Sequence, residues 1–153
     1  MRNCQTVLRA LAFGAALAFA APAAAQDSIK IGLLTDMSSV LSAGTGQGSV
    51  TAAEMAIEDF GGELLGRKIE LISADHQNKG DIGSSLARKW LYEEDVKLFM
   101  DIASSVVALA LRELVQESNV TMIYGSASSA ELTNKFCSPN TVSWNHDSYQ
   151  MAK

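Results

Sequence analysis

The chain has 153 residues, of which 48% are hydrophobic and 19% are charged, and its formal net charge at pH 7 is −5. This composition is typical of a globular protein and excludes a disordered or fibrous one. An acidic chain is also a poor partner for nucleic acid or an anionic membrane surface, and we expect neither as a partner.

The first 25 residues have the pattern of a secretory signal peptide. Arg2 and Arg9 give a positive N-terminal region before an apolar stretch, residues 11–21. Ala23-Ala24-Ala25 then provides an A-x-A cleavage pattern. The apolar stretch is shorter than the roughly 20 residues that a membrane span needs. We therefore expect cleavage between Ala25 and Gln26 and an exported mature protein.

Removal of the signal peptide changes the charge and the cysteine count. Without Arg2 and Arg9 the net charge becomes −7, and Cys137 is the one cysteine left. In an exported protein, an odd cysteine is either unpaired or paired with something outside the chain.

The mature part alternates apolar runs typical of strands with segments whose apolar residues recur at helical spacing. We predict strands at 28–34, 68–74, 97–102, 120–124 and 141–144, and helices at 50–60, 81–90 and 104–117. Gly61-Gly62 is expected to end the first helix, and Asp81 to cap the second. Ser104 or Ser105 is expected to cap the third, whose inward residues are Val107, Leu111 and Leu114.

This alternation predicts the α/β class, with a doubly wound parallel sheet whose strands are buried on both faces. In that architecture ligands bind at the carboxyl ends of the strands, where the strand order reverses. The segments that follow those ends are 36–48, 75–80, 103–105 and 125–130.

Several kinds of site have no matching pattern. Gly44-Thr45-Gly46-Gln47-Gly48 lacks the G-x-G-x-x-G spacing and the strand context of a dinucleotide-binding turn. Gly125 to Ser129 lacks the second glycine of a G-x-S-x-G nucleophile elbow, and the two histidines complete no triad. No ligand spacing indicates a metal. We expect neither a cofactor nor a metal.

Non-covalent capture of a small solute fits the small residues better. Ser104-Ser105 opens a helix whose free N–H groups attract a carboxylate. The turn made by Ser126, Ala127 and Ser128 adds hydroxyls and free backbone groups and leaves room for a ligand. The alternative is that these serines only cap helices and turns, which is a common use of serine.

The chain also resembles a known family, the substrate-binding proteins of branched-chain amino acid type ABC importers, which have the type I periplasmic-binding fold. The resemblance covers residues 29–153 and rests on Ile29 to Ser38, Gly48-Ser49-Val50, Ala52 to Gly62, Leu65-Gly66-Arg67, Asp75 to Lys79 and Ala130 to Thr133.

The resemblance implies a periplasmic protein without catalytic activity that closes on an amino acid or related organic acid or amide and delivers it to a membrane permease. The full-length protein is expected to be monomeric. The resemblance points to Ser104, Ser105, Ser126, Ala127 and Ser128 as ligand-binding residues, with Tyr149 near the crossover between lobes. It implies that residues 26–146 form the first lobe, and that residues 147–153 begin the crossover.

Two departures accompany the resemblance. Ser38-Ser39-Val40-Leu41 stands where the family commonly has Ser-Gly-Pro-Tyr, so a pocket aromatic is missing. Members are also more than twice this long, so we expect an N-terminal fragment that alone is poorly soluble and binds no solute tightly. A sensing domain of the same fold is one alternative function. A secreted α/β serine hydrolase that uses a serine of the Ser126–Ser129 turn is another.

Overall fold

The computed structural model describes residues 28–153, so the expected signal peptide and its cleavage site lie outside the described residues. The elements of this part are β1 (Ile29–Thr35), α1 (Gln47–Phe60), β2 (Glu63–Leu64), β3 (Arg67–Asp75), α2 (Gly80–Tyr92), β4 (Leu98–Met100), α3 (Ser105–Ser118), β5 (Thr121–Tyr124), α4 (Ala130–Thr133), β6 (Thr141–Ser143) and α5 (Ser148–Met151). None of the helices described is both long enough and apolar enough to cross a membrane.

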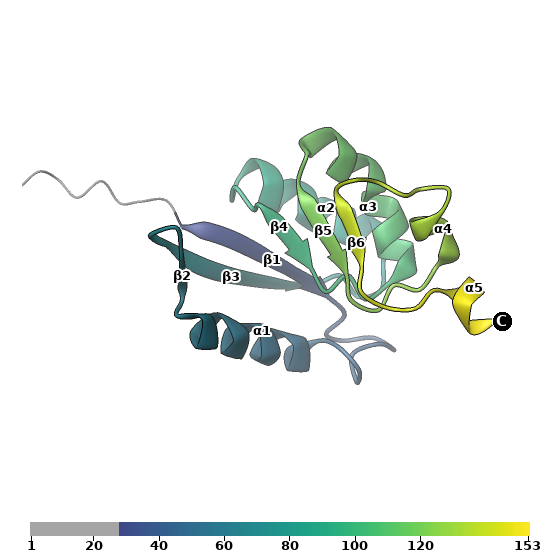
Figure 1. Cartoon of the computed structure of the whole chain (residues 1–153), viewed down its shortest axis with the longest axis horizontal. Helices are drawn as coiled ribbons and strands as arrows, with labels where there is room; N and C mark the ends of the chain where they lie inside the picture. Colours follow the sequence, from purple (N-terminus) through teal and green to yellow (C-terminus); the bar gives the residue numbers. More distant parts are fainter. Residues whose placement is uncertain (1–27) are drawn as a thin grey trace, which may run out of the picture.

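The strands form one sheet in the order β2-β3-β1-β4-β5-β6, in which only β2 runs antiparallel to its neighbour. Because β3 lies on one side of β1 and β4 on the other, the strand order reverses at β1. Figure 1 shows α1 on one face of the sheet and α2 and α3 on the opposite face. The predicted doubly wound parallel sheet is therefore confirmed.

The larger hydrophobic core lies between the sheet and the pair α2 and α3. Val107, Leu111 and Leu114 are buried there, as their helical spacing predicts. Trp90 of α2 stacks on Phe99 of β4, with ring centroids 6.0 Å apart. These contacts fix the helices that begin at the carboxyl edge of the sheet.

Glycine at position 32 is required by this packing. A Cβ atom on Gly32 would lie 2.7 Å from Trp90 Cε3, well inside van der Waals contact. The strand can therefore approach the indole closely only because this residue has no side chain.

Two of the predicted helix boundaries are confirmed and one is wrong. Gly61 ends α1 in the left-handed conformation, with φ 98°, and Ser104 caps α3. Asp81 does not cap α2, because the helix begins one residue earlier, at Gly80, and Lys79 is its N-cap. The Asp81 carboxylate lies in the first turn instead, where the helix dipole favours a negative charge.

The prediction that the strands are buried on both faces is wrong for β3. Its residues alternate between partly buried and exposed up to Glu70. The reason is its place in the sheet, since β2 pairs only with Arg67 and Lys68 and leaves the rest of β3 as an edge. Lys68 and Glu70 then point toward water, as is usual at an edge.

The α1 face of the sheet carries an apolar groove of about 340 Å³. It runs between α1 and the strands β1, β3 and β4 and is lined by Ile31, Ala53, Ala56, Ile57, Phe60, Ile69, Leu98 and Met100. Phe60 is 62% exposed at the end of this groove. Exposed apolar surface that is continuous over several residues favours association.

We expect residues 26–153, expressed alone, to self-associate through this groove. Phe60→Lys should shift the chain toward monomer, because a charge at the groove cannot be buried without a large desolvation cost. Sedimentation velocity measures the shift. Tyr92→Lys is the matched control, since Tyr92 is a similarly exposed aromatic residue on α2, outside the groove. A wild-type chain that stays monomeric at every concentration tested would contradict the prediction.

Candidate functional site

The candidate site lies at the carboxyl ends of β1, β3, β4 and β5, which meet at one edge of the parallel sheet. The chain segments there are 36–46, 76–79, 101–104 and 125–129. The reversal of strand order at β1 brings the segments after β1 and β4 next to each other. This is the place at which open α/β sheets bind ligands.

A buried carboxylate organises the loop after β1. Asp36 accepts hydrogen bonds from the N–H groups of Ser38, Ser39 and Leu41 and from the Ser39 hydroxyl. Burial raises the pKa of Asp36, but these four hydrogen bonds outweigh it and hold the pKa below its usual value. The loop is therefore fixed by a charged side chain rather than by the glycine and proline that are common in the family.

Asp75 ties the ends of β3 and β1 together. Its carboxylate accepts the N–H groups of Met37 and Gln77, at 3.0 and 2.8 Å, and the Ser38 hydroxyl at 2.5 Å. Burial raises the pKa of Asp75, but these hydrogen bonds lower it by more, so that the net shift is downward. Neither aspartate was predicted from the sequence as a residue that organises the site. The sequence Asp36-Met37-Ser38-Ser39 is the signal that indicates the first one, because an aspartate side chain can accept N–H groups that follow it in a turn.

Ser104 has a structural role at the start of α3. Its side chain accepts the N–H group of Val107 at 3.5 Å, and its hydroxyl donates to Asn78 Oδ1 at 2.6 Å. The residue is buried. Ser104 is therefore the N-cap of α3, and its hydroxyl proton is already donated to Asn78.

Ser105 joins the two predicted small-residue turns. Its Oγ accepts the N–H groups of Ser128 and Ser129, each at 3.1 Å. Because a hydroxyl has two lone pairs and one proton, these two bonds leave only the proton. Among the described residues this proton has no acceptor. Ser105 is therefore set to donate a hydrogen bond to a further group.

Fewer groups of the turn after β5 are free to bind a ligand than the sequence predicts. The N–H group of Ser128 is not free, because Ser105 takes it. The side chain of Ala127 packs into the hydrophobic core and is only 3% exposed, so it does not make room for a ligand. Ser126 is exposed, and in residues 28–153 its N–H and that of Ala127 have no hydrogen-bond acceptor. These two N–H groups remain available.

The turn after β5 also approaches β4 very closely. A Cβ atom on Gly125 would lie 2.3 Å from Asp101 Oδ1. Asp101 itself has a left-handed backbone, with φ 55°, and its buried Oδ2 has no partner among the described residues. Sequence reasoning did not single out Asp101, although it directly follows the apolar run of β4.

Tyr149 lies on α5, next to the turn after β5. Asp147 caps this short helix, and the N–H of Ser148 donates to the Ser128 carbonyl at 2.8 Å. The Tyr149 ring is 59% exposed, with Lys153 Nζ 4.6 Å from its centroid. The structure thus brings the start of α5 to the predicted serines, while the ring itself extends into solvent.

The serine hydrolase alternative finds no support in this geometry. His76 is fully buried, and its Nδ1 accepts the N–H of Asn78 rather than a serine hydroxyl. His146 is exposed, and within the described part no serine hydroxyl donates to it. Neither histidine is therefore placed to activate Ser126 or Ser128 in the described part of the chain. The described residues also contain no group of three or more His, Cys, Asp or Glu side chains that could hold a metal ion.

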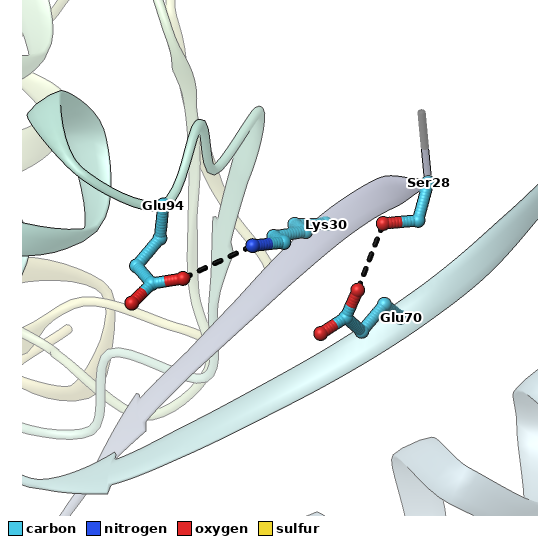
Figure 2. Close-up of polar contacts among 4 residues, drawn as sticks. All are labelled: Ser28, Lys30, Glu70 and Glu94. Carbon is cyan, nitrogen blue, oxygen red and sulfur yellow. Dashed lines mark hydrogen bonds and ion pairs between the residues drawn. The ribbon is translucent and has the colours of Figure 1, made fainter. Parts of the chain in front are cut away.

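A second hollow, of about 260 Å³, lies at the opposite edge of the sheet, near the start of β1. Figure 2 shows that the polar groups there pair with one another: Lys30 with Glu94 at 3.0 Å, and Ser28 with Glu70 at 2.8 Å. The hydrogen bond to Glu94 raises the pKa of Lys30. The side chains of Ser28, Lys30 and Glu94 in this hollow are therefore already paired, and the hollow is remote from the strand ends described above.

Comparison with known proteins supports the family resemblance. The periplasmic binding protein family matches residues 28–153. A periplasmic binding protein from Burkholderia mallei is 40% identical, with a TM-score of 0.77, over 79% of this chain and 32% of that one. No curated protein matches the chain.

Two further solved structures are informative. One is a branched-chain amino acid ABC transporter periplasmic ligand-binding protein from Burkholderia xenovorans, 35% identical with a TM-score of 0.75, over 78% of this chain and 32% of that one. The other is an ABC transporter solute-binding protein from Rhodopseudomonas palustris in complex with 3,4-dihydroxybenzoic acid. It is 25% identical with a TM-score of 0.72, over 80% of this chain and 33% of that one.

The present chain thus spans about a third of the length of these structures. Its sheet and helices match one part of a type I periplasmic-binding fold, and its sequence matches the family throughout the described residues. The chain belongs to the periplasmic binding protein family.

Proposed function

We propose that this chain carries the carboxylate-binding side of the solute-binding protein of an ABC importer. Residues 26–146 form the first lobe, and residues 147–153 begin the crossover to a second lobe. The protein captures a small organic acid outside the cytoplasm, delivers it to a membrane permease and catalyses no reaction. Family membership supports the extracytoplasmic location, and the signal peptide, cut after Ala25, provides the route.

The observation that carries the proposal is the hydroxyl of Ser105. Both of its lone pairs are occupied, so that it can only donate, and it lies at the amino end of α3. The N–H groups of Ser105 and Val106 have no acceptor within residues 28–153. Three donors at the positive end of a helix dipole favour an anionic acceptor.

The relatives indicate which anion to expect. One is described as a transporter protein for branched-chain amino acids, and another is bound to 3,4-dihydroxybenzoic acid. The group that these two solutes share is a carboxylate on a largely apolar body. The donors of α3, with the free N–H groups of Ser126 and Ala127 in the neighbouring turn after β5, suit that carboxylate. Tyr149 lies on α5, which begins next to Ser128, and we assign its ring to cover the apolar body of the solute when the lobes close.

Thermal-shift measurements on the complete gene product test this function. L-leucine, benzoate and 3,4-dihydroxybenzoate are the acids, and benzamide is the neutral control of the same shape as benzoate. A solute at a hundred times its Kd is expected to stabilise the protein by about 2.7 kcal/mol. We expect at least one acid to raise the melting temperature and benzamide to leave it unchanged. Equal shifts with benzoate and benzamide would contradict carboxylate recognition.

A further inference from the structure

Two consecutive residues in the loop between β3 and α2 have left-handed backbones. Gln77 has φ 53° and Asn78 has φ 54°. Left-handed conformations cost free energy for residues other than glycine, although asparagine tolerates them better than most. Such a pair persists only where the surrounding contacts determine it, and it often accompanies a functional arrangement.

The left-handed pair directs Asn78 to the start of α3. Asn78 Oδ1 accepts the Ser104 hydroxyl at 2.6 Å, and the Asn78 N–H donates to His76 Nδ1 at 3.0 Å. The N–H of His76 in turn donates to the Thr35 carbonyl at 2.9 Å. One short loop therefore links the carboxyl ends of β1 and β3 to the amino end of α3.

The bond from Ser104 decides how α3 begins. With its proton donated to Asn78, the Ser104 oxygen faces the helix only as an acceptor, which is what an N-cap requires. Ser105 follows directly and holds the N–H groups of Ser128 and Ser129. A change in the first turn of α3 would therefore move the Ser105 hydroxyl and the turn after β5 together.

We propose that Asn78 is a positioning residue of the solute site. It does not touch the solute. It fixes Ser104 and thereby keeps the Ser105 hydroxyl available as a donor to the solute. This inference rests on the proposed function, because it assigns Asn78 a role in the same site.

Asn78→Gly tests the role, because glycine adopts the left-handed backbone freely and removes only the side chain. Gln77→Gly is the matched control, since Gln77 has the same backbone conformation and an exposed side chain. In the complete gene product, Asn78→Gly is expected to speed hydrogen exchange of the Ser128 and Ser129 amides by about three- to tenfold, as for the loss of one net hydrogen bond. Binding of 3,4-dihydroxybenzoate and L-leucine, measured by calorimetry, should weaken by a similar factor.

The control variant and a double variant separate positioning from a general loss of stability. Gln77→Gly should leave both exchange and affinity within about twofold of wild type, since surface substitutions have small effects. In a chain that already carries Ser104→Ala, residue 104 has no hydroxyl, so Asn78→Gly breaks no hydrogen bond to it. It should then weaken binding less than about twofold, which reveals coupling between the two residues.

The outcomes also distinguish this inference from the proposed function. If wild type binds a probe and Asn78→Gly binds it equally well, Asn78 has no positioning role, while the proposed function stands. Equal losses in the wild-type and Ser104→Ala backgrounds would overturn the inference in the same way. If wild type binds neither probe, the proposed function is wrong, and the inference, which depends on it, is wrong as well.

Discussion

Replacing Ser105 with alanine is expected to weaken binding of the solute by about ten- to a hundredfold. The substitution removes the hydroxyl proton that we assign to the solute carboxylate, and a hydrogen bond to a charged group contributes about 1.5–3 kcal/mol. It also leaves the N–H groups of Ser128 and Ser129 without their acceptor, so that the turn after β5 loses its attachment to α3. Calorimetric titration with whichever probe acid shifts the melting temperature measures the change in Kd.

Ser85→Ala is the matched control for this prediction. It is the same chemical change at an exposed position of α2, remote from the strand ends. We expect its Kd to equal that of wild type. Ser105→Ala should also lower the free energy of unfolding by about 1–2 kcal/mol, because two amides lose their partner. If Ser105→Ala binds the acid as tightly as wild type does, the carboxylate does not bind at the amino end of α3.

The alternation of strands and helices could be predicted because its signals are local and repeated. Val107, Leu111 and Leu114 recur at helical spacing over about two turns, and all are buried as expected. Gly61 marks the end of α1, because the left-handed conformation there is far easier for glycine than for other residues. The parallel arrangement follows from that order of elements together with the need to bury both faces of the central strands.

The shortest elements could not be predicted, because they have too few residues to show a period. The strand β2 has two residues, and α4 and α5 have four each. The hairpin between β2 and β3 turns at Leu65 and Gly66, which both have positive φ. Leu-Gly lacks the Asn or Asp that usually indicates such a turn. The pairing with β3, rather than the local sequence, determines this element.

The candidate site was predictable in position but not in detail. Serines after the third and fourth predicted strands do meet at one edge, as the topology requires. Which group each hydroxyl contacts depends on residues distant in the chain, since Ser105 bonds to amides 23 and 24 positions away. Asn78 and Asp36 were missed because a side chain that binds backbone or hydroxyl groups in a loop looks, in sequence, like an ordinary solvated residue.

The second prediction with a large effect concerns His76, which is buried among carboxylates beneath the site. Burial lowers the pKa of His76, and the nearby charges of Asp36, Asp75 and Asp101 only partly offset this shift. Its Nδ1 accepts the Asn78 N–H, so the neutral ring carries its proton on Nε2, which is buried without a partner among the described residues. A second proton would have to go to Nδ1, where it would break the hydrogen bond from Asn78. The neutral ring is therefore the stable form in the folded protein.

The pH dependence follows from this lowered pKa. Between the folded pKa and the usual value of about 6.5, the unfolded chain binds a proton at this histidine and the folded chain does not. The free energy of unfolding should thus fall as the pH drops below about 6.5, with a slope of up to about 1.4 kcal/mol per pH unit. The slope should end at the folded pKa. The hydrogen-bonded carboxylates of Asp36 and Asp75, whose pKa values are also lowered, lose their contribution only below about pH 4.

Urea denaturation of the complete gene product between about pH 7 and pH 5 measures this slope for wild type and two variants. His76→Gln removes the titrating ring and retains a side-chain oxygen that can accept the Asn78 N–H, so its slope in this window should be smaller than that of wild type. His146→Gln removes the other histidine of the chain, which is exposed, and should leave the slope unchanged. If His76→Gln and wild type show the same slope, or if His146→Gln abolishes it, the buried ring is not the group that takes up the proton.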